Sequence, residues 1–141
     1  MSVRRVGVGD LFAMAGVLTG VARSADADPW DFLADPYSLL LVAEEGGHVV
    51  GWLCGYELIR LDGRRMLLIS SIEVAERARH RGHGRALVDA ALGVASRRGH
   101  TEVLAVSEPH DRDAHALFTG AGAREGRLTQ LYRWAVDRLV P

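Results

Sequence analysis

Glycines and arginines gather in one segment that could bind an anion. The stretch from Glu73 to Leu87 runs from an expected strand, through a glycine-punctuated loop, into an expected helix. Backbone N–H groups at the start of a helix are unpaired and lie at the positive end of its dipole, so they bind phosphate groups. Gly82 and Gly84 would let the main chain approach such a group, since neither carries a Cβ. The pattern favours a site for a pyrophosphate.

Basic side chains crowd the same segment. Three arginines add positive charge, at Arg79, Arg81 and Arg85, and two histidines stand between them, at His80 and His83. The histidines are three residues apart with no third ligand in view, so we expect them to contact phosphate or solvent rather than a metal ion. The alternative is a glycine-rich turn with a solvated basic face. A Rossmann-type loop fits poorly because its third glycine is missing, and a Walker loop is excluded because the chain has no lysine.

Hydrophobic spacing predicts the elements that must hold this loop. Apolar runs predict strands, helical spacing predicts helices, and Gly99 is placed to end the helix after the loop. Asp10 and Asp111 can each cap a further helix. Antiparallel strands come first and a strand-helix-strand crossover follows, which predicts an α+β fold with 103–106 as a buried strand. The strands are expected over 3–6, 38–43, 49–58, 66–74, 103–106 and 130–136.

Composition restricts the classes of protein that the chain can belong to. The 141 residues suit one domain over 1–141, and 48% hydrophobic with 25% charged residues is ordinary for a globular chain. A net charge of -1 gives no overall attraction to nucleic acid or to an anionic membrane, and no apolar run is long enough to span one. The single Cys54 excludes an internal disulfide, and the N-terminus lacks the apolar stretch of a secretory signal, so we expect a cytoplasmic chain.

Three blocks of residues resemble those of a known superfamily. Arg79-x-x-Gly82-x-Gly84 after a strand resembles the acetyl-CoA pyrophosphate loop of the GNAT N-acetyltransferases. Asp111-x-x-Ala114-x-x-Leu117-Phe118-x-x-x-Gly122 resembles the second motif helix of that superfamily, and Val49-Val50-Gly51 resembles the strand that opens its central meander. The blocks stand in the family's order and cover residues 38 to 126.

Within the superfamily, the chain most resembles the type I aminoglycoside 3-N-acetyltransferases. It shares their compact length, a strand that ends Ser71-Ile72-Glu73-Val74, and Ala116-Leu117-Phe118-Thr119 followed by Gly122-Ala123-Arg124-Glu125. The resemblance implies the GNAT fold, a mixed and mostly antiparallel central sheet of six to seven strands flanked by about four helices. It also implies a small-molecule amine as substrate and acetyl-CoA as co-substrate. From charge and ligand spacing we expect no metal, no nucleic acid and no membrane partner. The resemblance leaves open whether the chain forms a homodimer.

The resemblance also places the co-substrate. Acetyl-CoA would lie in a V-shaped split between the strand ending near Val74 and the strand ending near Val106. Main-chain groups around Ile72 and Val74 would bond its pantetheine arm, and Phe118 would pack either against that arm or in the core. The pyrophosphate would be cradled by Arg79, His80, Arg81, Gly82, His83, Gly84 and Arg85.

The amine would attack the thioester directly, so it must be neutral and the departing thiolate must be stabilised. Glu73, at the end of the co-substrate strand, is the candidate base, and the alternative is a solvated strand-end carboxylate. Ser71 lies on the same face, where type I enzymes carry Asp, and is better suited to positioning water. Phe118 stands where the family carries its general acid, a Tyr. Tyr132 on the final strand is the candidate substitute, and a buried structural tyrosine is the alternative.

Acidic and aromatic residues before the second strand are candidates for the acceptor site. Trp30, Asp31 and Asp35 belong to a loop that suits a polycationic amine such as an aminoglycoside or a polyamine, and the alternative is a solvated acidic loop. This loop also contains Asp26, Asp28 and Tyr37. The leading interpretation is an N-acetyltransferase for a small cationic amine. The alternatives are acetylation of a protein N-terminus or lysine, and a non-catalytic acyl-CoA-binding module.

Overall fold

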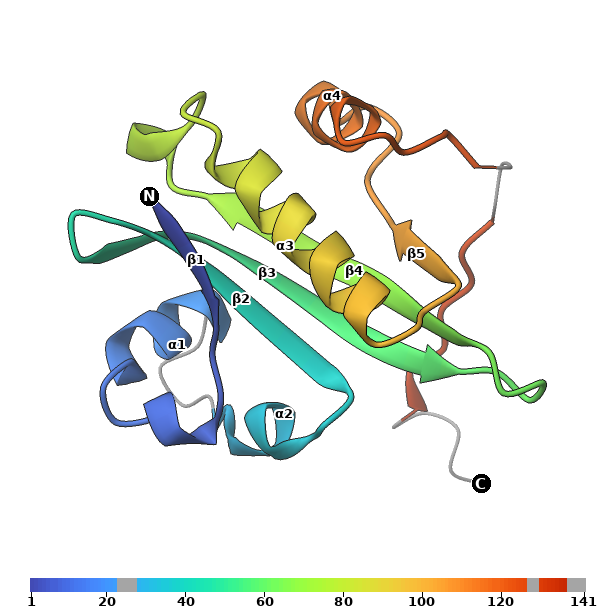
Figure 1. Ribbon diagram of the computed structural model, residues 1–141, viewed down its shortest axis with the longest axis horizontal. Coiled ribbons are helices and arrows are strands. Elements are labelled where there is room, and N and C mark those ends of the chain that lie inside the picture. The colour runs from blue at the N-terminus through green and yellow to red at the C-terminus, as the bar shows by residue number, and fades with distance from the viewer. Residues whose placement is uncertain (23–27, 127–129, 137–141) are drawn as a thin grey trace.

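The computed structural model describes residues 1–22, 28–126 and 130–136. The strands are β1 (Ser2–Arg5), β2 (Ser38–Glu45), β3 (His48–Ile59), β4 (Arg65–Val74) and β5 (Glu102–Ala105). The helices are α1 (Ala15–Ala22), α2 (Trp30–Ala34), α3 (His83–Arg97) and α4 (Arg112–Gly120), with short 3-10 turns at Val8–Asp10 and Glu76–Ala78. Figure 1 shows α3 lying across one face of the sheet, with α1 and α2 on the side of β1 and β2.

The strands form one sheet in the order β1-β2-β3-β4-β5. The first four pair antiparallel with their neighbours, as consecutive strands joined by short turns do. β5 pairs with β4 in parallel because α3 carries the chain back across the sheet before β5 begins. The predicted α+β class is confirmed, and the described residues contain five strands rather than six or seven.

Two sets of apolar side chains pack the two faces of the sheet. The cluster under α3 centres on Leu53, Leu67 and Leu87, each with no exposed surface. The cluster under α1 and α2 centres on Val42 of β2, joined by Met14 and Leu18 from the N-terminal region. The alternation of side chains along β2 supplies both faces, which is why this strand is buried over six consecutive residues.

One extra residue changes the alternation along β4. The pairing of β3 with β4 shifts between Cys54 and Gly55, so Ser70 has no partner opposite it. Its Oγ instead donates to the carbonyl oxygen of Cys54 over 3.1 Å. Such a bulge swaps the faces of all residues beyond it. The residues Ile72 and Val74 therefore pack with α3, as Leu67 and Ile69 do, while Ser71 and Glu73 take the opposite face.

The predicted strands 3–6, 38–43, 49–58, 66–74 and 103–106 lie within two residues of the observed ones. The prediction that a helix begins at Asp10 is wrong, because α1 begins at Ala15. The carboxylate of Asp10 instead accepts a hydrogen bond from the backbone N–H of Gly7 over 2.9 Å. Asp10 therefore closes a 3-10 turn before the helix, whereas Asp111 caps α4 as predicted, through the N–H of Ala114. Gly99 follows the end of α3 with φ +71°, also as predicted.

Two predictions for the C-terminal third are wrong. The strand 103–106 is not buried, since β5 is an edge strand on which Leu104 remains 40% exposed and Val106 lies beyond its end. The stretch 130–136 was expected to be a strand, but the structure shows no strand there. Aromatic and β-branched residues favour a strand only where a neighbouring strand can pair with it. Among the described residues, no helix is both long and apolar enough to cross a membrane.

We expect Leu87→Ala to lower the free energy of unfolding by about 2–5 kcal/mol, because it leaves a cavity where α3 meets the sheet. Urea denaturation followed by circular dichroism measures this change. The matched control is Leu61→Ala in the exposed turn between β3 and β4, which should change stability by no more than about 0.5 kcal/mol. Equal effects of the two substitutions would contradict the packing described here.

Candidate functional site

The parallel strands β4 and β5 separate before β4 ends. Their pairing runs from Met66 to Ile69 of β4, and β5 has no counterpart for the residues 70–74. In Figure 1 the chain leaves β5 and turns away from β4 to reach α4. Over 70–74, therefore, β4 pairs with β3 on one side and has no strand on the other among the described residues. We call this opening the split.

Backbone groups of β4 point into the split. The N–H of Ala75 donates to the carbonyl oxygen of Val50 over 2.7 Å, so Ala75 and Glu73 direct their backbone groups toward β3. Because these directions alternate along a strand, the backbone groups of Ile72 and Val74 point the other way. The side chain of Arg79 bonds the carbonyl oxygen of Val74 from that side, over 3.1 Å. The split thus offers an N–H and a carbonyl of Ile72, and the N–H of Val74, to an extended ligand.

The glycine loop leads from β4 into α3. Gly82 is the residue before the helix, with φ +86°, and no side chain caps the helix there. The first intrahelical bond runs from the N–H of Ala86 to the carbonyl of Gly82, so the N–H groups of residues 83–85 precede it. A Cβ built on Gly82 would meet nothing closer than the Met1 side chain at 3.9 Å. Glycine is favoured here by its left-handed backbone, and the space above it is open to an anion.

Gly84 also lets two helices approach each other. A Cβ at this position would lie 3.3 Å from the side chain of Leu117, on α4. The missing side chain therefore lets α3 and α4 approach closely, and α4 forms a wall beside the split. Phe118, the neighbour of Leu117, is half-buried on the same helix.

The arginines of the loop already have partners within the protein. Besides the bond from Arg79 described above, Arg85 binds Asp89 over 2.9 Å and donates to the carbonyl of Gly120 over 2.7 Å. Arg81 lies 3.2 Å from a carboxylate oxygen of Glu45. These bonds hold the loop against β4, α4 and the β2–β3 turn. All three side chains remain exposed, so each keeps donors that can reach an anion.

The two histidines of the loop differ in position. His80 is exposed and adopts a left-handed backbone conformation, φ +61°. The side chain of His83 is 2% exposed, and its Nε2 lies 3.0 Å from an Oε2 of Glu45. The prediction that the His83 side chain contacts phosphate or solvent is therefore wrong, because the ring is turned inward under the loop. Its Nδ1 is buried without a hydrogen-bond partner among the described residues.

Glu45 is a part of the site that sequence reasoning missed. It ends β2 and holds both His83 and Arg81, which are 38 and 36 residues away along the chain. Those two contacts, the histidine first, lower the pKa of the Glu45 carboxyl below its usual range. No local pattern marks this residue, because its partners come near only when the β2–β3 turn reaches the start of α3.

The candidate catalytic residues lie on the face of β4 opposite α3. Glu73 is half-buried opposite Trp52, and Ser71 is exposed opposite Cys54. Burial raises the pKa of the Cys54 thiol, and a hydrogen bond with Ser71 partly offsets the effect. Tyr132 is 72% exposed and lies outside any strand, so neither the predicted strand position nor the buried structural role is correct. In Figure 1 the segment 130–136 runs past β5, away from the start of α3.

The acceptor candidates belong to α2 and its flanks. Trp30 and Asp31 begin α2 and Asp35 follows it, whereas Asp26 lies outside the described residues. The carboxylate of Asp35 accepts from the N–H of Tyr37 over 2.8 Å, and that of Asp28 accepts from Trp30 over 2.9 Å. These two aspartates therefore stabilise local turns. α2 packs on the same sheet face as Glu73, through Phe32, whose ring meets Tyr56 edge to face at 5.6 Å. Within the described ranges, no three His, Cys, Asp or Glu side chains are placed to hold a metal ion.

We expect Glu45→Gln to change how stability depends on pH. A carboxyl whose pKa is lower in the folded chain stabilises it above the unfolded pKa, about 4.3, and loses this contribution as the pH falls further. The melting temperature of wild type should therefore fall further than that of Glu45→Gln between pH 6 and pH 3.5. The control is Glu102→Gln, an exposed carboxylate on β5, which should follow wild type. Parallel curves for wild type and Glu45→Gln would contradict the assigned contacts.

A family model and a curated relative both match most of this chain. Residues 16–123 match the family model for the acetyltransferase (GNAT) family. A mycothiol acetyltransferase from Clavibacter sepedonicus is 29% identical over 159 residues, which cover 93% of this chain and 50% of that protein. The chain thus spans about half the length of this curated relative.

Solved structures share the fold at low sequence identity. An aminoglycoside acetyltransferase from an uncultured soil metagenomic sample superposes with a TM-score of 0.81 at 22% identity, covering 95% of this chain and 98% of that one. The aminoglycoside N-acetyltransferase AAC(6')-Iy, solved with CoA, gives 0.77 at 17%, covering 95% and 99%. A ribosomal-protein-alanine N-acetyltransferase from Brucella melitensis biovar Abortus 2308 gives 0.75 at 21%, covering 95% and 100%. With the family match over most of its length, the chain belongs to the GNAT acetyltransferase family.

Proposed function

We propose that the chain is an N-acetyltransferase that moves the acetyl group of acetyl-CoA to a primary amine of a small cationic acceptor. One observation carries the proposal. The open edge of β4 and the uncapped start of α3 meet at the glycine loop, so an extended ligand in the split would end with its phosphates over Gly82. Acetyl-CoA has this shape and charge, an amide-rich arm followed by a pyrophosphate.

Each part of acetyl-CoA would find a matching part of the protein. The N–H groups of residues 83–85 and the spare donors of Arg79, Arg81 and Arg85 would bind the pyrophosphate. Ile72 and Val74 would pair with the amides of the pantetheine arm, as a neighbouring strand would. The half-buried ring of Phe118 would pack against the same arm. The thioester would then lie near Glu73, at the end of β4.

Direct transfer requires the protein to position the amine against the thioester and to remove a proton. Glu73 would take a proton from the ammonium group of the acceptor, directly or through a water held by Ser71, so that the neutral amine attacks the thioester carbon. The C–N bond forms, the C–S bond breaks, and CoA departs as a thiolate, while the surplus proton on the new amide nitrogen passes to that thiolate or to water. A thiol has a pKa of about 8.5, so the thiolate can leave without a general acid. The absence of a hydroxyl on Phe118 is therefore compatible with activity.

The acceptor would approach from the side of α2. α2 packs on the sheet face that carries Glu73, and the carboxylates of Asp31 and Asp35 near the Trp30 ring suit a cationic amine. Several structures with the same fold are those of aminoglycoside acetyltransferases, which supports an aminoglycoside-like acceptor. The Brucella structure named for ribosomal-protein alanine supports a protein N-terminus as the second candidate.

We expect acetyl-CoA to raise the melting temperature of wild type and of Gly82→Asn, but not of Gly82→Asp. Asn and Asp tolerate a left-handed backbone better than other side chains, so both variants should fold. They have the same shape, but the carboxylate of Asp would repel the pyrophosphate. Differential scanning fluorimetry with increasing acetyl-CoA measures the shift. Equal shifts in the two variants would place the pyrophosphate elsewhere.

We expect Glu73→Gln to lower the rate of acetyl transfer about 100-fold near neutral pH, with partial recovery at higher pH as the neutral amine becomes more abundant. Release of free thiol from acetyl-CoA measures the rate, first with wild type and a panel of aminoglycosides, polyamines and peptides with free N-termini. The control is Glu76→Gln, which removes an exposed carboxylate from the 3-10 turn after β4.

Three outcomes would count against the proposal. Rates within a few-fold of wild type for Glu73→Gln would mean that Glu73 is a solvated strand-end carboxylate and not the base. Thiol release with peptides alone would make the chain a protein acetyltransferase. Binding of acetyl-CoA without turnover of any amine, together with turnover by Phe118→Tyr, would mean that wild type is an acyl-CoA-binding module.

A further inference from the structure

A second concave site lies on the other side of α3, at the edge of the sheet opposite the split. It is a groove of about 410 Å³ between β1 and α3. Its apolar lining comes from Leu41 of β2 with Ala90 and Val94 of α3. Its basic lining includes Arg5 of β1 with Arg97 and Arg98 at the end of α3. β1 is the edge strand next to β2, so the groove and the split lie at opposite edges of the sheet.

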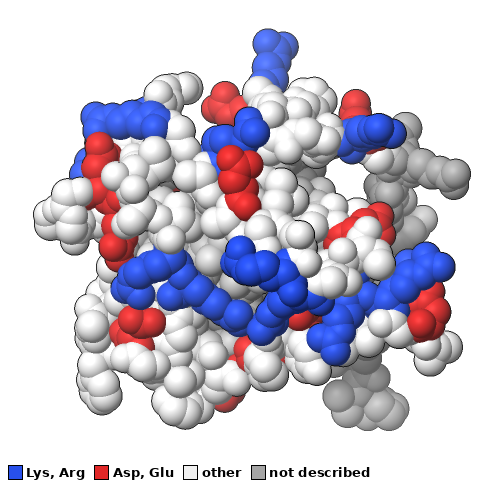
Figure 2. All heavy atoms as spheres, viewed as in Figure 1, with Lys and Arg blue, Asp and Glu red and all other residues white. Residues whose placement is uncertain are grey.

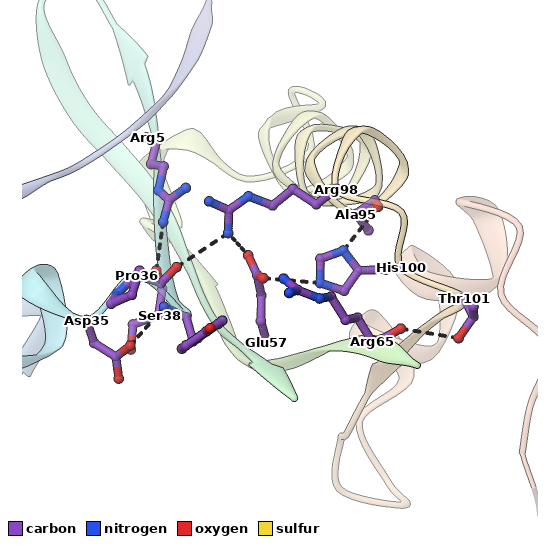
Figure 3. Close-up of polar contacts among 11 residues, drawn as sticks. Arg5, Asp35, Pro36, Ser38, Glu57, Arg65, Ala95, Arg98, His100 and Thr101 are labelled. Carbon is purple, nitrogen blue, oxygen red and sulfur yellow. Dashed lines mark hydrogen bonds and ion pairs between the residues drawn. The ribbon is translucent and has the colours of Figure 1, made fainter. Parts of the chain in front are cut away.

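Two guanidinium groups of the groove lie next to each other. Arg5 donates to the carbonyl oxygen of Ser38 over 3.0 Å, and Arg98 donates to that of Pro36 over 3.4 Å. These acceptors are two residues apart, so their donors must also be close. Figure 3 shows the side chain of Arg5, from β1, and that of Arg98, from α3, extending toward one another above this segment. Like charges so close are unfavourable unless an anion lies between or beside them.

The buried carboxylate of Glu57 offsets part of this charge, and Arg98 and His100 share it. Glu57 of β3 forms an ion pair with Arg98, and its other oxygen lies 3.4 Å from Nε2 of His100. The side chains of Glu57 and His100 are 2% and 0% exposed, so neither turns toward the groove. Nδ1 of His100 bonds the carbonyl of Ala95 over 3.1 Å. Glu57 is therefore committed to Arg98 and His100, and it leaves Arg5 without a carboxylate.

The positive charge of Arg97 also lacks a neighbouring carboxylate among the described residues. Its Nη1 would lie 3.2 Å from a Cβ built on Gly93, so the guanidinium folds back along the groove over the bare backbone of α3. Neither Arg5 nor Arg97 has an acidic partner in the part of the chain that the structure describes. Asp89, which also lines the groove, is already paired with Arg85. Figure 2 shows the result as a band of basic side chains across this face.

We propose that this groove binds a small phosphate monoester, with the phosphate between Arg5 and Arg97 and the organic part along Leu41, Ala90 and Val94. A phosphate monoester carries a charge of about -1.5 to -2 at pH 7, which matches the two unpaired guanidinium groups. Arginine binds phosphate oxygens through two parallel N–H bonds, and a partly enclosed apolar floor strengthens such bonds. A polyanion such as nucleic acid fits less well, because the net charge of the chain is -1.

The test must separate this groove from the glycine loop, which could also bind phosphate. The experiment therefore uses Gly82→Asp, in which a carboxylate blocks the loop, and titrates it with inorganic phosphate at constant ionic strength. Phosphate should raise its melting temperature by a few degrees, and chloride should not. Adding Arg5→Gln and Arg97→Gln to this background should weaken the apparent affinity for phosphate at least about tenfold. Adding Arg64→Gln, in the exposed β3–β4 turn, should leave the affinity unchanged.

Other outcomes would overturn the proposal. A phosphate shift in wild type that is lost in Gly82→Asp would place the phosphate at the loop. A shift that survives Arg5→Gln with Arg97→Gln would place it at a third position. Equal shifts with phosphate and chloride would indicate screening alone. A shift with a DNA duplex but none with phosphate would make the band a surface for polyanions. Each result is obtained without acetyl-CoA or turnover, so it is independent of the proposed acetyl transfer.

Discussion

β4 has one more residue than β3 across their shared pairing, and that residue is Ser70. Without it, Ser71 and Glu73 would face α3 and the apolar core, where a carboxylate would be costly. With it, Ile72 and Val74 fill the core and Glu73 faces the side of α2. The bulge also coincides with the point where β5 leaves β4. A single inserted residue therefore separates the part of the strand that builds the sheet from the part that is available to a ligand.

α3 lies between two sites of different construction. At its start, the glycine loop presents backbone N–H groups, with side chains tied back to β4, α4 and the β2–β3 turn. At its end, Arg97 and Arg98 complement the negative end of the helix dipole and line the groove beside β1. The same helix buries Leu87 and Ala91 against the sheet, so the positions of both sites depend on one packed interface.

Much of this arrangement could be predicted from the sequence, where the cause is local. The period of apolar residues predicted α3, the cap at Asp111 predicted the start of α4, and glycine spacing predicted the loop. Failures occurred where the cause was distant. The stretch 130–136 has the composition of a strand, but no neighbouring strand pairs with it among the described residues. The start of the first helix is a local failure, because the Asp10 carboxylate bonds the N–H of Gly7, before it in the chain. The contacts of Glu45 and Glu57 join residues about 40 positions apart, which no local pattern reveals.

The missing cap at Gly82 has a consequence for the dynamics of α3. A helix normally satisfies its first N–H groups with a side chain, and the last turn of α3 has Gly99 and the bond from Arg98 to Val94 to close it. The first turn has no such closure within the described chain, and the residues before it hold left-handed conformations at His80 and Gly82. Local opening of the helix should therefore begin at this end. An anion bound there would accept the hydrogen bonds that the start of the helix leaves unmade. Binding of the anion and protection of these amides from hydrogen exchange would then follow the same equilibrium.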